Sequence, residues 1–155
     1  MQSSLLHAKE KTRMPKPRDI AFADIHVGDT AFFETVITSQ IIHDFAKLSG
    51  DFNPLHTDSI YAQELNLKDR IPHGMIAGAL FSRLVGMELP GLHSMYMSQY
   101  ITFHIPLPIE ETIIVKGVVM QLIDAMQSIK ITTTIEGKKS GEVFVRGEAL
   151  VRVLL

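Results

Sequence analysis

The sequence predicts an α+β domain in which an antiparallel sheet wraps around one long buried helix. Residues 75–89 (MIAGALFSRLVGMEL) are apolar on nearly every side of a helix, which is typical of a helix buried in a core. The residues that follow are rich in β-branched and aromatic side chains with partial alternation, which predicts strands arranged as an antiparallel meander. The expected strands cover residues 94–107, 111–123, 128–137 and 142–155.

The first half of the chain is expected to contribute one strand and two helices. Residues 31–37 are mostly β-branched, aromatic or small, which favours a strand. An apolar stripe predicts a helix over residues 39–48, and Gly50 stands where that helix must stop. A shorter helix is expected over residues 59–65, with Asp58 placed to cap it.

Length and composition indicate one domain with a proper core, since the chain has 155 residues and 46% of them are apolar. We assign this domain to residues 20–155. Residues 1–19 carry five Lys or Arg and two prolines without a hydrophobic period, which predicts a flexible N-terminal tail.

Charge and residue usage exclude several classes of function. The formal net charge of −2 provides no large positive field for nucleic acid. The absence of cysteine excludes disulfides, a thiolate nucleophile and thiolate-bound metals. No apolar run is long enough for a signal peptide or a membrane span, so we expect a cytoplasmic protein without a membrane partner.

A row of small residues recurs every four positions along the expected buried helix: Gly74, Gly78, Ser82 and Gly86. Such a row lets either a sheet or a slender ligand approach the helix closely. Close packing of the helix on its sheet is the favoured interpretation, because a glycine inside a helix otherwise costs about 1 kcal/mol.

Two short segments carry the residues with chemical potential. Asp51 and His56 flank Asn53 and Pro54 in a stretch dense in turn formers, which could direct both side chains at one water. A carboxylate and an imidazole on one water provide an acceptor and a proton carrier near neutral pH. Gly74 follows His73 at a helix start, where free backbone N–H groups suit a developing oxyanion.

The two segments together closely resemble a known motif. SGDFNPLHTDSIYAQ followed by IPHGMIAGALFS is similar to the hydratase motif of the MaoC-like, (R)-specific enoyl-CoA hydratase family, which has the hotdog fold. The resemblance continues through ELPG and SMYMSQYITFHIPLP to GEALVRV and covers residues 20–155. The chain shows no departure from the family's pattern within the two core motifs.

The resemblance implies hydration of a trans-2-enoyl-CoA to an (R)-3-hydroxyacyl-CoA. By motif position, Asp51 and His56 would hold and deprotonate the water that attacks C3 and then return a proton to C2. The backbone amide of Gly74 would stabilise the thioester oxygen as it becomes an enolate. This chemistry requires no metal and no cofactor.

The resemblance also implies a homodimer whose sheets join edge to edge, with residues 39–73 as a helical overhang that covers the acyl tunnel. Asn53 would brace the loop or orient the aspartate. The expected substrate-binding residues are Asn53, His73, Ser82 and Val85, of which the last two would line the acyl pocket.

Three alternatives remain open from the sequence. A hotdog acyl-CoA thioesterase would direct the water at C1 instead of C3, and a non-catalytic acyl-binding module would not turn over its ligand. A metal oxygenase could use His56 and Asp58 with His73 or His104. This last alternative is disfavoured because Asp58 is better explained as a helix cap.

Overall fold

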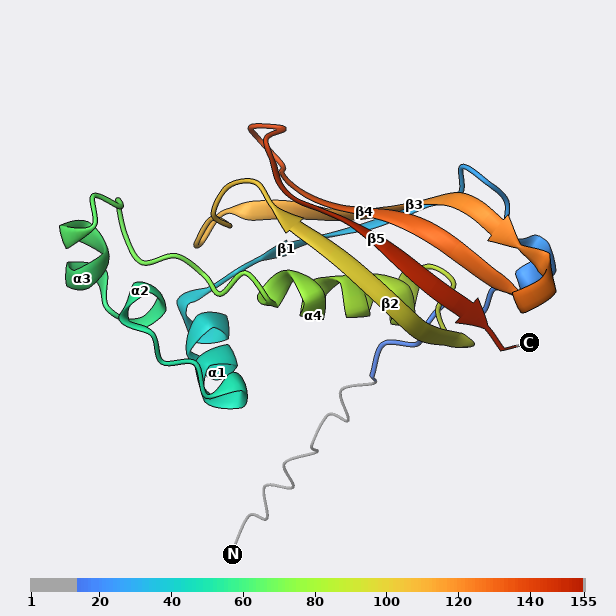
Figure 1. The fold of residues 1–155 in the computed structure, drawn as a ribbon, viewed down its shortest axis with the longest axis horizontal. Helices are drawn as coiled ribbons and strands as arrows, with labels where there is room; N and C mark the ends of the chain where they lie inside the picture. Colours follow the sequence, from blue (N-terminus) through green and yellow to red (C-terminus); the bar gives the residue numbers. More distant parts are fainter. Residues whose placement is uncertain (1–13, 155) are drawn as a thin grey trace, which may run out of the picture.

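Five antiparallel strands form a single sheet above the longest stretch of helix (Figure 1). The computed structural model describes residues 14–154. The strands are β1 (Thr30–Val36), β2 (Ser94–Phe103), β3 (Thr112–Ile123), β4 (Ser128–Gly137) and β5 (Val143–Val153). Each contains most of a segment predicted from its β-branched and aromatic residues, so all five predicted strands are confirmed.

The order of the strands differs from a simple meander. The sheet runs β1-β3-β4-β5-β2, so β2 pairs with β5 at the far edge and not with β3, its successor along the chain. Only β3, β4 and β5 form a meander. Short turns join these three strands, whereas residues 104–111 include two prolines and lead from β2 at one edge to β3, which lies beside β1.

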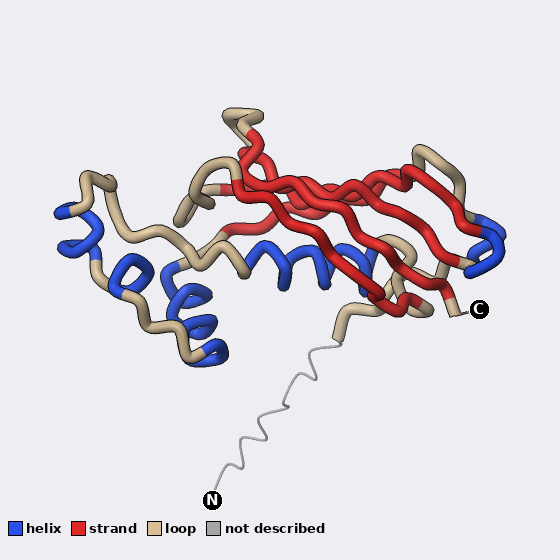
Figure 2. The backbone as a smooth tube through the Cα atoms, viewed as in Figure 1, coloured by secondary structure: helices blue, strands red, loops and turns tan. Residues whose placement is uncertain are grey.

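Helix α4 (Ile76–Arg83) continues into a π-helical turn η2 (Leu84–Glu88) and lies against the sheet (Figure 2). One side of this stretch is fully buried in the hydrophobic core and contributes Ile76, Ala77, Phe81, Leu84 and Val85. The opposite side is not covered within the described chain, where Met75 is 59% exposed and Ser82 is also exposed. The predicted buried helix under the sheet is therefore confirmed, although in the described chain its own sheet covers only one side of it.

The row of small residues brings this helix close to β2. A Cβ atom at Gly74 would lie 3.0 Å from the ring of Phe103, and one at Gly78 would lie 3.8 Å from Ile101. Helix–sheet packing, the favoured interpretation, therefore accounts for the first two glycines of the row.

Three helices, α1 (Ser39–Ser49), α2 (Pro54–Thr57) and α3 (Ser59–Glu64), gather beyond one end of the sheet (Figure 1). Gly50 ends α1 in the left-handed conformation with φ 75°, as its position predicted. Asp58 caps α3 by accepting hydrogen bonds from the backbone amides of Ile60 and Tyr61 at 2.8 and 3.2 Å. The two predicted helices are confirmed, and α2, a single turn, is an addition to them.

The segment before β1 is attached to η2 and to the turn that follows it. The Arg18 N–H donates to the Met87 carbonyl at 2.8 Å, and the Leu92 N–H donates to the Arg18 carbonyl at 2.8 Å. His93 Nε2 lies 3.1 Å from Asp19 Oδ1. Residues 1–13 of the predicted tail lie outside the described residues, and these contacts begin before residue 20, so the domain boundary stays a prediction.

No helix among residues 14–154 combines the length and apolar character needed to cross a membrane.

A polar network lies on the inner side of the sheet between β2 and β4. Tyr96 Oη donates to the Gln99 side-chain oxygen, and Gln99 Nε2 donates to Thr133 Oγ1 at 3.2 Å and to the Tyr100 carbonyl at 2.7 Å. Thr133 is fully buried. Burial raises the pKa of Tyr96 from 10.0 to about 12.

This raised pKa predicts a loss of stability in alkali. Between pH 10 and 12 the unfolded chain releases the Tyr96 proton while the folded protein retains it, so the free energy of unfolding falls as pH rises through this window. The Tyr96→Phe variant should lack this contribution. Urea midpoints of the two proteins at pH 8, 10 and 11 should therefore converge with rising pH, and parallel pH profiles would contradict the prediction.

Candidate active site

The segment between α1 and α3 places Asp51 and His56 close to each other. Asp51 follows the left-handed Gly50, and its Oδ1 accepts a hydrogen bond from the Asn53 N–H at 3.1 Å. Asn53 then caps α2 by accepting from the Leu55 N–H at 3.0 Å. His56 lies on that single helical turn, so both the loop and a short helix position the pair.

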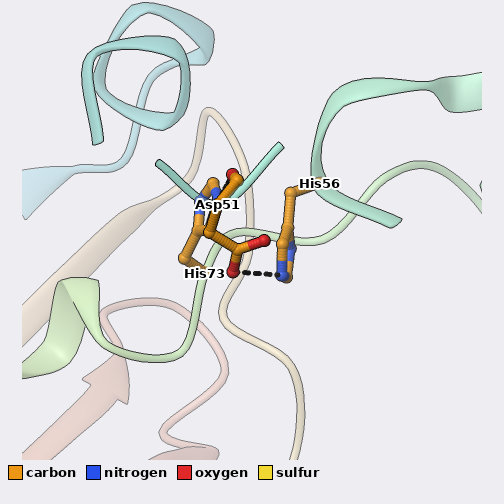
Figure 3. A group of neighbouring side chains, drawn as sticks. All are labelled: Asp51, His56 and His73. Carbon is orange, nitrogen blue, oxygen red and sulfur yellow. Dashed lines mark hydrogen bonds and ion pairs between the residues drawn. The ribbon is translucent and has the colours of Figure 1, made fainter. Parts of the chain in front are cut away.

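Asp51 and His56 leave a narrow gap between their polar atoms (Figure 3). Asp51 Oδ2 lies 3.9 Å from His56 Nε2, which is too long for a direct hydrogen bond but can be bridged by one water that contacts both atoms. The carboxylate side chain is 51% exposed, whereas the His56 side chain is 14% exposed.

The hydrogen bond made by Nδ1 of His56 determines which ring nitrogen carries the proton in the neutral ring. His56 Nδ1 lies 2.8 Å from the Ile71 carbonyl oxygen, which can only accept, so Nδ1 carries the proton of the neutral ring. His56 Nε2 therefore presents its lone pair towards the gap. This arrangement allows His56 to take a proton from a water in the gap.

His73 lies behind this pair and is 2% exposed. Its Nε2 donates to the Asp51 carbonyl at 2.9 Å, and its ring lies 4.0 Å from the His56 ring, centroid to centroid, with a tilt of 31°. The sequence predicts that His73 binds substrate, but the side chain is buried and its Nε2 bonds the backbone of Asp51; that assignment stays a prediction.

A pocket of about 260 Å³ opens beside His56 and Gly74. Its walls are mostly apolar and comprise His56, Ile71, Pro72, Gly74, Phe103, His104, Ile105, Pro106 and Leu107. Among the described residues, no carbonyl accepts a hydrogen bond from the Gly74 N–H, which precedes α4. The pocket thus combines a proton acceptor, an unused backbone donor and apolar walls.

The other predicted substrate-binding residues lie away from this pocket. Ser82 is exposed on α4, and Val85 is 1% exposed within the core. Their assignment to the acyl pocket stays a prediction. The sequence analysis did not assign Phe103 to the site and named His104 only as a possible metal ligand. Both residues reach the pocket from the end of β2, and side-chain alternation does not reveal where a strand ends in space.

Three potential metal ligands meet at the same place. Ligand atoms of Asp51, His56 and His73 lie within 4.8 Å of one another. Two imidazoles that share an ion point their in-plane lone pairs at one centre, whereas these rings lie nearly stacked. The geometry fits a water between Asp51 and His56 better than an ion held by all three residues. Asp58, the other ligand of the oxygenase alternative, caps α3.

Comparisons with known proteins identify the family of this chain. A model of the MaoC-like domain family matches residues 11–140. The chain is 34% identical to the 3-hydroxybutyryl-CoA dehydratase of Methylorubrum extorquens over 90% of this chain and 88% of the relative. It is 35% identical to the (R)-specific enoyl-CoA hydratase of Rhodospirillum rubrum over 85% of this chain and 90% of the relative.

The fold is also similar to that of a solved structure. The unliganded R-hydratase PhaJ1 from Pseudomonas aeruginosa superimposes with a TM-score of 0.83 and 31% identity, covering 88% of this chain and 87% of that one. This likeness confirms the predicted hotdog fold. The chain therefore belongs to the MaoC-like domain family, whose relatives here are hydratases and dehydratases.

Proposed function

We propose that this enzyme adds water to a trans-2-enoyl-CoA to give an (R)-3-hydroxyacyl-CoA, and catalyses the reverse dehydration. The observation that supports this most directly is the 3.9 Å gap between Asp51 Oδ2 and His56 Nε2, next to a pocket that Gly74 also lines. The names of the two relatives, a hydratase and a dehydratase of CoA thioesters, describe the two directions of one reaction.

In the proposed mechanism, one water is held between Asp51 and His56. His56 Nε2 accepts a proton from this water, while the Asp51 carboxylate accepts its second hydrogen bond and orients the oxygen towards C3 of the substrate. The new C3–O bond displaces the electrons of the double bond onto the thioester oxygen. The pair then returns a proton to C2, so that one water has been added in total.

The Gly74 N–H stabilises the negative charge that develops on the thioester oxygen. A thioester oxygen within reach of this N–H gains negative charge as the enolate forms, and a preorganised donor stabilises it more than the starting thioester. A single such donor is typically worth about 10²–10³ in kcat. The apolar walls formed by Phe103, Ile105 and Leu107 suit the acyl chain.

We further propose that the chain forms a homodimer. Strand β2 is an edge strand in the described chain, and its Met97 and Tyr100 are exposed, as is Met75 on the neighbouring uncovered side of α4. Exposed apolar side chains beside an unpaired strand edge favour pairing with a second copy.

Incubation with crotonyl-CoA tests the reaction. We expect loss of the enoyl absorbance without release of free thiol, and a product that an (R)-specific 3-hydroxyacyl-CoA dehydrogenase oxidises. Thiol release at the same rate as enoyl loss would support the thioesterase alternative. A stable absorbance with unchanged binding of the ligand would support a non-catalytic acyl-binding module.

A further inference from the structure

His73 contacts both members of the Asp51–His56 pair without reaching solvent. It stands in the segment that leads into α4, 22 residues after Asp51 and 17 residues after His56. Its side chain is buried and lies between the His56 ring, at 4.0 Å, and the Phe45 ring, at 5.1 Å. Figure 3 shows the three polar side chains grouped together.

The hydrogen bond from His73 fixes which of its nitrogens carries the proton. The Asp51 carbonyl can only accept, so the neutral His73 ring holds its proton on Nε2. Nδ1 is then an acceptor, and it has no partner among the described residues although it is buried. A buried polar atom without a partner costs free energy, so the packing of this residue is not optimised for stability alone.

The same bond is a long-range restraint on the backbone of Asp51. The other recorded bonds of Asp51 are local, since its N–H donates to Ser49 Oγ at 3.2 Å and its Oδ1 accepts from the Asn53 N–H. These local bonds fix the shape of the loop at Asp51 but do not attach Asp51 to α4. The contact from His73 attaches this loop to the start of α4, where Gly74 lies.

His56 is held by the same short segment. The Ile71 N–H donates to the Leu55 carbonyl at 3.1 Å, and the Ile71 carbonyl accepts from His56 Nδ1. The ring of His73 then supports the face of the His56 ring. Residues 71–74 therefore contact the carboxylate loop, the imidazole and, through Gly74, the oxyanion position.

We propose that His73 is a positioning residue: its Nε2–H and its ring together hold Asp51 and His56 in register with the Gly74 amide. The expected effect of His73 on turnover rests on the proposed function. The hydrogen bond and the tautomer of His73 are independent of that function. His73 itself touches no reacting atom. A displacement of about 1 Å at a catalytic group can cost about 10²-fold in rate, which sets the scale of the effect.

A matched pair of variants tests the proposal. The amide nitrogen of Gln in His73→Gln can reach the place of Nε2, whereas that of Asn in His73→Asn reaches only the place of Nδ1. We expect kcat to fall about 10- to 100-fold in His73→Asn with little change in KM, and His73→Gln to recover most of this loss. Equal kcat values in the two variants, or wild-type kcat in both, would overturn the proposal.

Two further measurements separate positioning from simple loss of stability. Val151→Ala truncates a buried core side chain of β5 and should lower the melting temperature without changing kcat below that temperature. His73→Phe keeps a ring against His56 but lacks the donor, so it should lose kcat even where its melting temperature matches that of Val151→Ala. Full activity in His73→Phe would show that the hydrogen bond is dispensable.

The last measurement does not depend on turnover. Long-range ¹H–¹⁵N spectra of the wild-type protein should assign the Nε2–H tautomer to His73 and the Nδ1–H tautomer to His56. If these tautomers are found but no enoyl-CoA is hydrated, the proposed function fails while the positioning contact stands. If His73 instead carries its proton on Nδ1, the positioning proposal fails whatever the activity.

Discussion

Truncation of either member of the catalytic pair, in Asp51→Ala or His56→Ala, is expected to lower kcat for hydration by about 10³-fold. Acid–base assistance is typically worth about 10²–10⁴ in rate, and each variant removes one of the two groups that contact the water. Asp51 is half-exposed and His56 loses one hydrogen bond to Ile71, so the cost in stability should be only about 1 kcal/mol. Stopped-flow or steady-state decay of enoyl absorbance measures the effect.

The double variant distinguishes a shared water from two independent effects. If Asp51 and His56 act on one water as a unit, removal of both should be scarcely worse than removal of either. Asp44→Ala and His43→Ala provide matched controls, since both residues are exposed on α1 outside the pocket. Full activity in either single catalytic variant, or losses that multiply in the double variant, would contradict the assignment.

The elements with strong local signals were predicted almost residue by residue. The helix expected over 39–48 is α1, because an apolar stripe and a left-handed glycine at position 50 both act within a few residues. The strand expected over 128–137 coincides with β4. In both cases the signal depends on side chains that are neighbours along the chain.

The features that were missed depend on neighbours far apart in the sequence. A strand with β-branched residues pairs equally well with several partners, so the sequence could not place β2 beside β5. An apolar side of a helix has the same composition whether the chain's own sheet or another molecule covers it. The sequence therefore did not reveal that Met75 is exposed in the described chain.

In the candidate site, too, the contacts that are local in sequence were predicted and the long-range contacts were not. Asp51 and His56 are five positions apart, so a turn-forming stretch between them was enough to predict that they approach each other, and the structure places them 3.9 Å apart. Gly74 lines the same pocket as His56. The tautomer of His56 depends on the Ile71 carbonyl, and the support of Asp51 depends on His73; both contacts required coordinates.

Gly147 is a further residue that the sequence alone did not single out. It lies within β5, where glycine normally weakens a strand, and pairs with Ile101 of β2 and Thr133 of β4. A Cβ atom at this position would overlap the Tyr100 carbonyl oxygen and the Gln99 amide, and would lie 2.7 Å from Thr133 Oγ1. The missing side chain therefore makes room for the polar network that joins β2 to β4.

Gly147→Ala is accordingly expected to destabilise the fold by about 3 kcal/mol, because overpacking and broken buried hydrogen bonds each cost about 1–3 kcal/mol. For a domain of this size that loss lowers the melting temperature by about 10 °C.

Gly86→Ala is the matched control, because a Cβ atom there meets nothing within 4 Å. Alanine should keep or raise stability at this position, since it favours helix over glycine by up to about 1 kcal/mol. Thermal unfolding followed by circular dichroism compares the two variants. Both variants make the same chemical change. Any difference between their effects on stability therefore arises from the surroundings of each glycine. A Gly147→Ala protein that melts with or above the wild type would show that β2 can move away from β5 at little cost.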